Sequence, residues 1–398
     1  MKRRAYLKRK TQYGIVLIFI SLCIIYCLFS VQTCYAFAQT VDQSLNESVL
    51  EQIESLDLES LQAYVDSLGV FTEENVAERL YRYIKGEEID YANLGNELLA
   101  VLFAKVSDVL PAFACIMAIT LLAGLISTMK SGTNVRTTSG MIFLMTYVAA
   151  LIPLIAVLTE CIQEAKNGVM AMQQQMQIVL PILLTLMAAS GGTLTVSVCR
   201  PAVGFFATNI VSVIHSVVFP ITLTIIVFSM IANLGNDLKI SKFTAFFKGI
   251  NKWIIGVCIS VFGIFFTLQG ITAANYDGIV RRAAKYAIGN GIPIVGGFLS
   301  GGFDLAVAGS VLIKNSLGNM SIFLMLAVIF EPLTLLIAVN VLLRLTAAIT
   351  QPFGEGKISD FLGETAENLN YCTAGLLFTA FLYFLTIMLM IYSSEALF

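Results

Sequence analysis

The chain is 398 residues long, and 57% of its residues are hydrophobic whereas only 13% are charged. Soluble domains carry about 25% charged residues, so a water-soluble globular fold has too little interior to hide this much apolar surface. Lipid is the natural solvent for the excess, and the composition therefore predicts a membrane protein. The formal net charge is only −2, but the charges are unevenly distributed, so local charge is more informative than the total.

The N-terminus has the three-part pattern of a secretory signal peptide. Residues 1–10 include six basic and no acidic residues, Gly14–Val31 is apolar, and Ala36, Phe37 and Ala38 form an A-x-A site. We expect a signal peptide over residues 1–38, with cleavage before Gln39. The alternative is an uncleaved first transmembrane helix. Both interpretations keep the basic end in the cytoplasm and place residue 39 outside.

An acidic segment follows at residues 39–97, with fourteen acidic and three basic residues. Apolar residues recur at helical spacing from Val49 to Leu68 and again from Val76 to Ile84. The pattern predicts two or three short amphipathic helices in an extracytoplasmic segment. This segment is either a solvated cap that packs on the membrane part or a docking surface for a partner.

Residues 98–398 are predicted to form the polytopic transmembrane part of an all-α protein. A spanning helix needs about 20 apolar residues. Six runs meet this requirement: Val106–Thr128, Met141–Cys161, Pro201–Ala232, Trp253–Thr272, Ser321–Thr346 and Tyr371–Tyr392. Two less regular runs, Ile178–Val198 and Ile292–Leu312, bring the expectation to a bundle of about six to eight spans.

The two less regular runs share a pattern. Each has a proline, then apolar residues, then Ser-Gly-Gly, then a second half-length apolar stretch. The residues are Pro181, Ser190, Gly191 and Gly192 in the first run and Pro293, Ser300, Gly301 and Gly302 in the second. Backbone exposed by a break inside a membrane is tolerated only where it is buried in protein or lines a water-filled cavity. Two broken segments in corresponding halves are typical of transporter binding sites. We interpret these residues as a candidate pore or helix-break site built from re-entrant hairpins; close helix packing through the glycines is the alternative.

Two basic clusters bear on topology. Lys239, Lys242, Lys248 and Lys252 form one, and Arg281, Arg282 and Lys285 form the other. Only one apolar run separates them, so we expect them on opposite sides of the membrane, and one of them must violate the preference of cytoplasmic loops for positive charge. If Ile178–Val198 dips in and out, the lysine cluster is cytoplasmic; if it spans, the arginine cluster is.

Ionisable residues inside apolar runs are hypotheses of function. The candidates here are Glu331, Asp304, Lys314, His215 and Arg344. Glu331 either pairs with Lys314 or Arg344 as a structural contact, or lines a pore and binds a cation. A single histidine on an apolar helix more often bonds to a neighbouring helix than takes part in catalysis.

Several catalytic patterns are missing from the sequence. It has no P-loop, no HExxH and no GxSxG, and its one histidine excludes a site built from several histidines. We therefore expect no enzymatic activity, no cofactor and no metal site. The basic loops are too short to indicate a nucleic-acid partner.

Three stretches resemble a known family. Gly278–Gly318 closely resembles the corresponding region of the stage III sporulation protein AE family of endospore-forming bacteria, with support from Pro181–Gly192 and Leu342–Gly363. The overall plan is also similar: a signal peptide, an acidic outer segment and a polytopic membrane region.

The resemblance implies a role in forespore development. Members of this family belong to an eight-protein operon whose products join a forespore protein across the double membrane around the engulfed forespore. The resulting assembly looks like a secretion-type channel between mother cell and forespore. This chain would be its large multi-pass component in the outer forespore membrane. The other channel proteins, a separate ATPase and the lipid bilayer would be its partners. Two alternatives stay open: a stand-alone secondary transporter for a small metabolite, and a membrane scaffold that conducts nothing.

Overall fold

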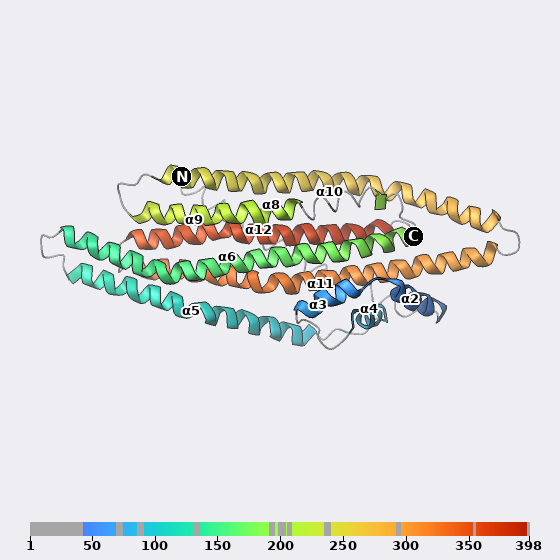
Figure 1. The fold of residues 1–398 in the computed structure, drawn as a ribbon, viewed down its shortest axis with the longest axis horizontal. Coiled ribbons are helices and arrows are strands. Elements are labelled where there is room, and N and C mark those ends of the chain that lie inside the picture. The colour runs from blue at the N-terminus through green and yellow to red at the C-terminus, as the bar shows by residue number, and fades with distance from the viewer. Residues whose placement is uncertain are drawn as a thin grey trace.

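The computed structural model is an elongated bundle of helices (Figure 1). It describes residues 43–68, 75–85, 91–129, 136–190, 196–197, 204, 209–234, 240–291, 296–352 and 356–395. Throughout these residues the regular elements are helices, without a strand. This confirms the predicted all-α class. The predicted signal peptide at residues 1–38 lies outside the described residues.

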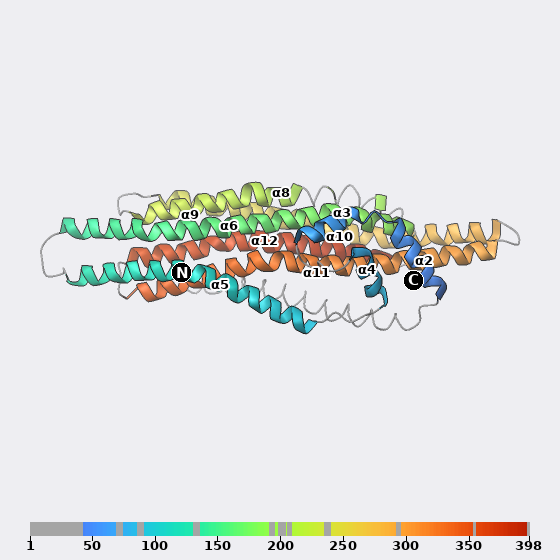
Figure 2. The ribbon, with the colours of Figure 1, turned by 60° about the horizontal axis from the view of Figure 1, so that its bottom comes forward.

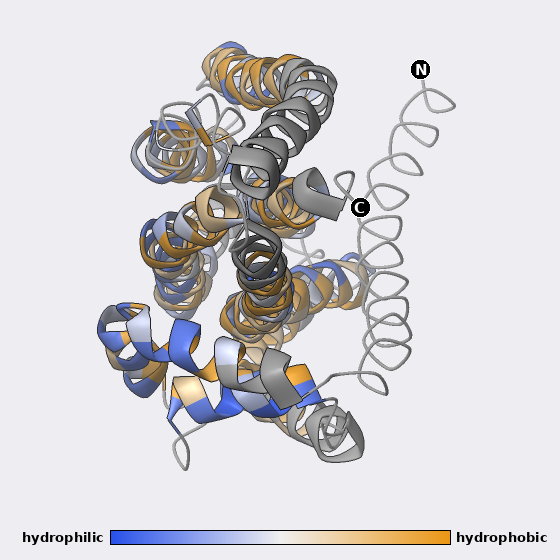
Figure 3. Ribbon diagram, turned by 90° about the vertical axis from the view of Figure 1, so that its right-hand side faces the viewer, coloured by the Kyte–Doolittle hydropathy of each residue, from blue (hydrophilic) through white to orange (hydrophobic). Residues whose placement is uncertain are grey.

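Three short helices form the N-terminal part that the structure describes: α2 (Gln43–Ser55), α3 (Glu59–Leu68) and α4 (Val76–Lys85). Each is amphipathic, and each buries apolar residues one turn apart, such as Val76, Leu80 and Ile84 in α4. Figure 3 shows them at the bottom of the end-on view as a layer rich in hydrophilic residues. They correspond to the short helices predicted in the acidic segment.

The rest of the described chain is built from long helices that run alternately in opposite directions (Figures 1 and 2). They are α5 (Tyr91–Met129), α6 (Arg136–Ala189), α9 (Phe219–Leu234), α10 (Ser241–Gly291), α11 (Gly296–Thr350) and α12 (Gly356–Glu395). A short helix α8 (Val211–Val213) and a π-helical turn η2 (Ile214–Val218) lead directly into α9. Because α5 begins at Tyr91, the acidic segment passes into the membrane part inside one helix.

Six helices of the described chain are long and apolar enough to cross a membrane. The apolar stretches are Phe103–Leu122, Leu144–Ala189, Val211–Asn233, Ser241–Thr267, Leu305–Thr350 and Ile358–Tyr392. Each of them overlaps one of the six regular runs predicted from the sequence. The chain is therefore a multi-pass helical membrane protein.

Two of these helices are much longer than predicted. α6 has 54 residues and α11 has 55, so each joins a regular run to one of the two less regular runs. The predicted break at Ser300, Gly301 and Gly302 is wrong, because these residues lie inside the continuous helix α11. Glycine lowers helix propensity by about 1 kcal/mol relative to alanine, and packing along a 55-residue helix outweighs that cost.

The first predicted break has a different outcome. α6 continues past Pro181 and ends at Ala189. Ser190 then forms a turn, in which its N–H donates to the Leu186 oxygen at 2.9 Å and its Oγ to the Met187 oxygen at 2.9 Å. Gly191, Gly192 and Pro293 lie outside the described residues. α6 thus ends at the first predicted break, whereas α11 continues through the second.

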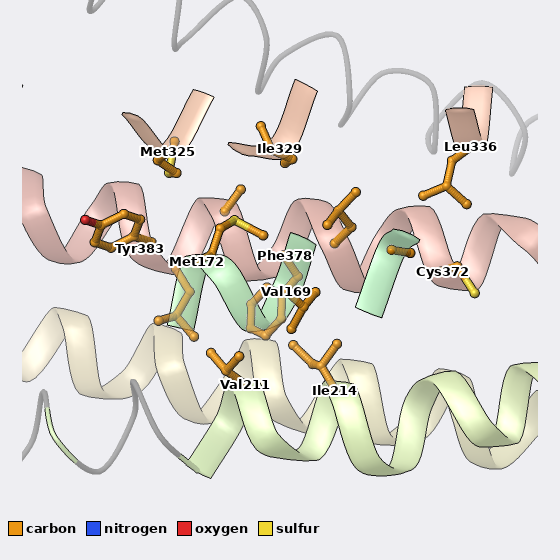
Figure 4. Close-up of a cluster of buried hydrophobic side chains, with 14 of the residues drawn as sticks. Val169, Met172, Val211, Ile214, Met325, Ile329, Leu336, Cys372, Phe378 and Tyr383 are labelled. Atoms are coloured by element: carbon orange, nitrogen blue, oxygen red, sulfur yellow. The ribbon is translucent and has the colours of Figure 1, made fainter. Parts of the chain in front are cut away.

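The core lies around α12, which packs against α6, α9 and α11 (Figure 4). This cluster includes Val169 and Met172 of α6, Ile329 of α11, and Cys372 and Phe378 of α12. Close approach depends on glycine at one position in particular. A Cβ at Gly168 would lie 2.8 Å from Cγ of Pro332, so α6 and α11 pack more closely here than any other residue would allow.

Candidate functional site

The predicted intramembrane residues do not converge on one site. The first, Glu331 of α11, forms an ion pair with Lys105 of α5, with 2.6 Å between Oε1 and Nζ. The side chain of Glu331 is 52% exposed and that of Lys105 is 26% exposed. Asp108 and Glu164 also act electrostatically on Lys105. Glu331 thus belongs to a group of charges on the outer surface of the bundle.

The predicted pairing of Glu331 with Lys314 or Arg344 is wrong. All three residues lie on α11, and a helix rises 1.5 Å per residue, which places Lys314 about 25 Å and Arg344 about 20 Å from Glu331 along the axis. Neither side chain can bridge that distance. The partner instead comes from α5, which packs along α11.

Lys314 is fully buried. Its ammonium group donates hydrogen bonds to the backbone oxygens of Met390 and Ile391, at 3.1 and 2.8 Å. Both oxygens belong to the last turns of α12, where the helix dipole is negative and favours a cation. Lys314 therefore fastens α11 to the C-terminal end of α12.

Arg344 takes part in a second polar network between α11 and α12. Its Nε donates to Oδ1 of Asn340 at 2.8 Å. The Asn340 amide in turn donates to the Ala366 oxygen at 2.6 Å and to Oδ1 of Asn370 at 3.1 Å. Sequence reasoning missed Asn340 and Asn370, although an asparagine inside an apolar helix is itself a signal of an interhelical hydrogen bond.

A third network joins α9 to α12 and was also missed. Ser229 donates its hydroxyl to Oε2 of Glu364, and the Asn233 amide donates to the same oxygen at 3.3 Å. The predicted run over this part of the chain begins at Tyr371, but α12 begins at Gly356. For this reason Glu364 was not recognised as an intrahelical residue that faces the bundle.

The remaining candidates stand apart from these networks. His215 is half-buried in the π-helical turn η2, near enough to Lys166 to interact electrostatically. Asp304 belongs to α11, but its side chain lies outside the described residues. Among the side chains that the structure describes, no group of three or more His, Cys, Asp or Glu residues is arranged to hold a metal ion.

These contacts define the class of protein: a polytopic helical membrane protein whose helices are joined by buried polar contacts. The model of a family described as stage III sporulation protein AE matches residues 75–394. The chain belongs to this family, as the sequence resemblance indicated.

A curated relative, the stage III sporulation protein AE of Bacillus subtilis (strain 168), is 26% identical over 233 residues. The match covers 58% of this chain and 57% of the relative, so the two are similar over a little more than half of their lengths. No solved structure matches the chain.

Proposed function

We propose that this chain is the multi-pass membrane component of a channel or secretion-like complex that connects mother cell and forespore, and that it resides in the outer forespore membrane. The observation that carries the proposal is the family match over residues 75–394, which includes all six candidate membrane helices. Membership of a sporulation family supports the role in sporulation, and the six apolar helices support the location in a membrane.

The attachment of α2–α4 supports a role in assembly. Gln52 of α2 donates its amide to the Ala306 oxygen of α11 at 3.2 Å and accepts from Ser310 Oγ at 2.9 Å. Tyr64 of α3 donates its hydroxyl to the Ala171 oxygen of α6 at 3.0 Å. These contacts hold the three helices against the bundle. α2, α3 and the turn between them leave an acidic face exposed, which carries Glu51, Glu54, Asp57, Glu59 and Asp66.

In this proposal the acidic face of α2 and α3 binds other proteins of the complex through their basic surfaces, because complementary charge orients encounters and excludes wrong partners. The chain itself carries out no catalysis, and a separate ATPase supplies the energy. A stand-alone transporter is less well supported, because one of its two predicted helix breaks is a continuous helix.

The test is co-purification from sporulating cells of the chain carrying Glu51→Lys and Glu54→Lys, with sporulation measured at matched protein abundance. The matched control is Glu51→Asp with Glu54→Asp, which keeps both charges. We expect the charge reversal to lower both partner recovery and sporulation several-fold, and the control to leave both unchanged. If the wild-type chain co-purifies with no other sporulation protein and still transports a small solute alone in liposomes, the proposal is wrong.

A further inference from the structure

One exposed stripe runs along α6, and its residues change from mostly apolar to mostly polar part-way along the helix. Its first large residues are apolar: Met141, Leu144, Met145, Val148, Ile152 and Ile155. From residue 159 on, most of the exposed positions are polar: Thr159, Glu160, Gln163, Asn167, Gln174, Gln177 and Thr185, with Met170 as the large apolar exception. The helix is continuous from Arg136 to Ala189. One face of a single helix therefore meets an apolar environment over its first half and a polar one over its second.

Two neighbouring helices also carry exposed apolar residues after their charged residues. On α11, Ile337, Val341 and Leu345 are exposed after Glu331. On α5, exposed Leu110 and Leu122 follow Asp108, and exposed Phe103 precedes Lys105. The Lys105–Glu331 ion pair and the contact of Gly168 with Pro332 place the charged residues of α5 and α11 near the level at which the stripe on α6 changes. We call the charged group at this level the polar band; it consists of Lys105, Asp108, Glu160, Glu164 and Glu331.

α10 lies on another side of the bundle and carries a long exposed apolar surface. Its exposed large apolar residues are Phe243, Phe246, Trp253, Val257, Ile259, Val261 and Ile264. From Phe243 to Ile264 the helix rises about 31 Å at 1.5 Å per residue, so this part of α10 is long enough to cross a hydrocarbon core of about 30 Å.

Ring contacts relate α10 to the levels of the other helices. Near its start, Phe247 stacks on Phe228 of α9 with 5.4 Å between ring centroids. Further along, Phe262 packs edge-on against Phe378 of α12 at 6.5 Å. Phe378 lies in the core cluster with Val169 and Ile329 (Figure 4). Val169 is next to Gly168 in the sequence, and Ile329 is close to Glu331. Over the side chains that the structure describes, the apolar surface of α10 therefore reaches the level of the polar band.

The other end of this apolar surface carries lysines. Lys242 lies in the first turn of α10, and Lys248 and Lys252 follow about 9 and 15 Å further along the helix, where long lysine stems can lie along the apolar surface and extend toward the headgroups. Figure 1 shows the beginnings of α6 and α10 at the same end of the bundle. Positive charge at that end, from these lysines and Arg136, favours a cytoplasmic location.

We propose that the bilayer surrounds only this lipid belt, between the lysine end of α10 and the polar band, and that the rest of the bundle projects from the membrane on the extracytoplasmic side. α6 continues from Glu160 to Ala189 and α11 precedes Glu331 from Gly296. At 1.5 Å per residue the projection is about 45 to 55 Å long.

The position of α2–α4 supports the proposal independently. These helices attach at Ala171 of α6 and at Ala306 and Ser310 of α11, beyond the polar band. Their exposed carboxylates, among them Glu51 and Glu54, require water at this level, because an ionised carboxylate in hydrocarbon costs several kcal/mol. Inside the projection Val179, Leu183 and other apolar residues of α6 are buried, as in a helix bundle surrounded by water.

The test compares single cysteines on the exposed stripe of α6 in a chain whose eight native cysteines are replaced by alanine. Ile152→Cys lies in the lipid belt and Gln177→Cys lies in the projection. They are separated by about seven helical turns, so both side chains point in nearly the same direction. The chain is expressed in a bacterium that has a single membrane and forms no spores, and intact cells are treated with a membrane-impermeant maleimide.

A thiol in hydrocarbon does not ionise to the reactive thiolate, so we expect Gln177→Cys to be labelled at least about tenfold more than Ile152→Cys. Both variants must react fully after denaturation in SDS, which shows that each thiol is present. Equal protection of both positions in intact cells overturns the proposal, as does labelling of Gln177→Cys only in inverted vesicles. Because this host contains no other sporulation protein, the result is independent of the proposed channel function.

Discussion

The ammonium group of Lys314 lies 2.8 Å from the backbone oxygen of Ile391, at the point where α11 passes the end of α12. Lys314 is fully buried, and a buried charge is costly unless polar groups surround it. The carbonyl oxygens of the last turns of α12 supply that environment, since the C-terminal end of a helix carries partial negative charge. The contact thus joins two helices at the far end of the bundle from the lipid belt.

Reversal of this charge should be far more damaging than its removal. Lys314→Glu places a carboxylate against carbonyl oxygens and should lower the free energy of unfolding by about 3 kcal/mol or more. Lys314→Met keeps the length of the side chain without a charge, so its cost should stay below about 1.5 kcal/mol. Unfolding in SDS, followed for the purified chain in detergent, measures both. Equal stability of the two variants would show that the charge of this side chain does not determine the stability of the contact.

The approach of α6 to α11 at Gly168 gives a second prediction. A Cβ there would lie 2.8 Å from Pro332 Cγ and 3.3 Å from Leu376 Cδ1, so Gly168→Ala should destabilise the chain by about 1 to 3 kcal/mol through overpacking.

Gly256 of α10 is the matched control, because a Cβ there would meet nothing within 4 Å. Gly256→Ala should be neutral or stabilising by up to about 1 kcal/mol, since alanine is the better helix former. The same SDS unfolding experiment compares the two. A Gly168→Ala variant as stable as Gly256→Ala would contradict the close packing described.

The six regular apolar runs could be predicted from the sequence as parts of long helices because an apolar length rule is enough to find them. The continuity of α6 could not be found by that rule, because polar residues from Gln163 to Gln177 separate its two apolar halves. Helix propensity offered a further signal. That stretch is rich in glutamine, methionine and alanine, which are good helix formers, and a helix that leaves the membrane can carry polar residues on its outer face.

The positions of the polar residues were less predictable than the helices. The helical rise could have excluded Lys314 and Arg344 as partners of Glu331, because both are about 20 Å or more away along the same helix. No sequence rule selects Lys105, since that pairing depends on how α5 packs against α11. The contacts of Glu364 with Ser229 and Asn233 depend in the same way on the packing of α12 against α9.

The Lys105–Glu331 ion pair should contribute little to stability. Its carboxylate is half exposed, and exposed ion pairs contribute about 0 to 1 kcal/mol. We therefore expect a coupling free energy below about 1 kcal/mol in a double-mutant cycle of Lys105→Ala and Glu331→Ala. Glu331→Gln should also leave sporulation at the wild-type level at matched abundance, because Glu331 faces outward at the polar band. A loss of sporulation without a loss of protein would instead support the pore-lining hypothesis for this residue.

Tyr64 allows a test of the attachment of α3 that depends on pH. Its hydroxyl donates to the Ala171 oxygen at 3.0 Å, and burial raises the pKa of Tyr64 above its ordinary value. In the unfolded chain the phenol ionises near its usual pKa of about 10. The stability that neutral Tyr64 contributes is therefore fully present below about pH 10 and is lost as the pH rises from there toward the folded-state pKa.

Tyr64→Phe removes both the hydrogen bond and the ionisation. We expect it to lower the stability of the attached helices by about 0.5 to 1.5 kcal/mol at pH 8, and the difference from wild type to shrink above about pH 10. Limited proteolysis of α2–α4 at a series of pH values, with a protease active in alkali, measures that difference. A difference that stays constant from pH 8 to pH 11 would mean that Tyr64 is not buried against α6, and the anchor of α3 on the projection would have to lie elsewhere.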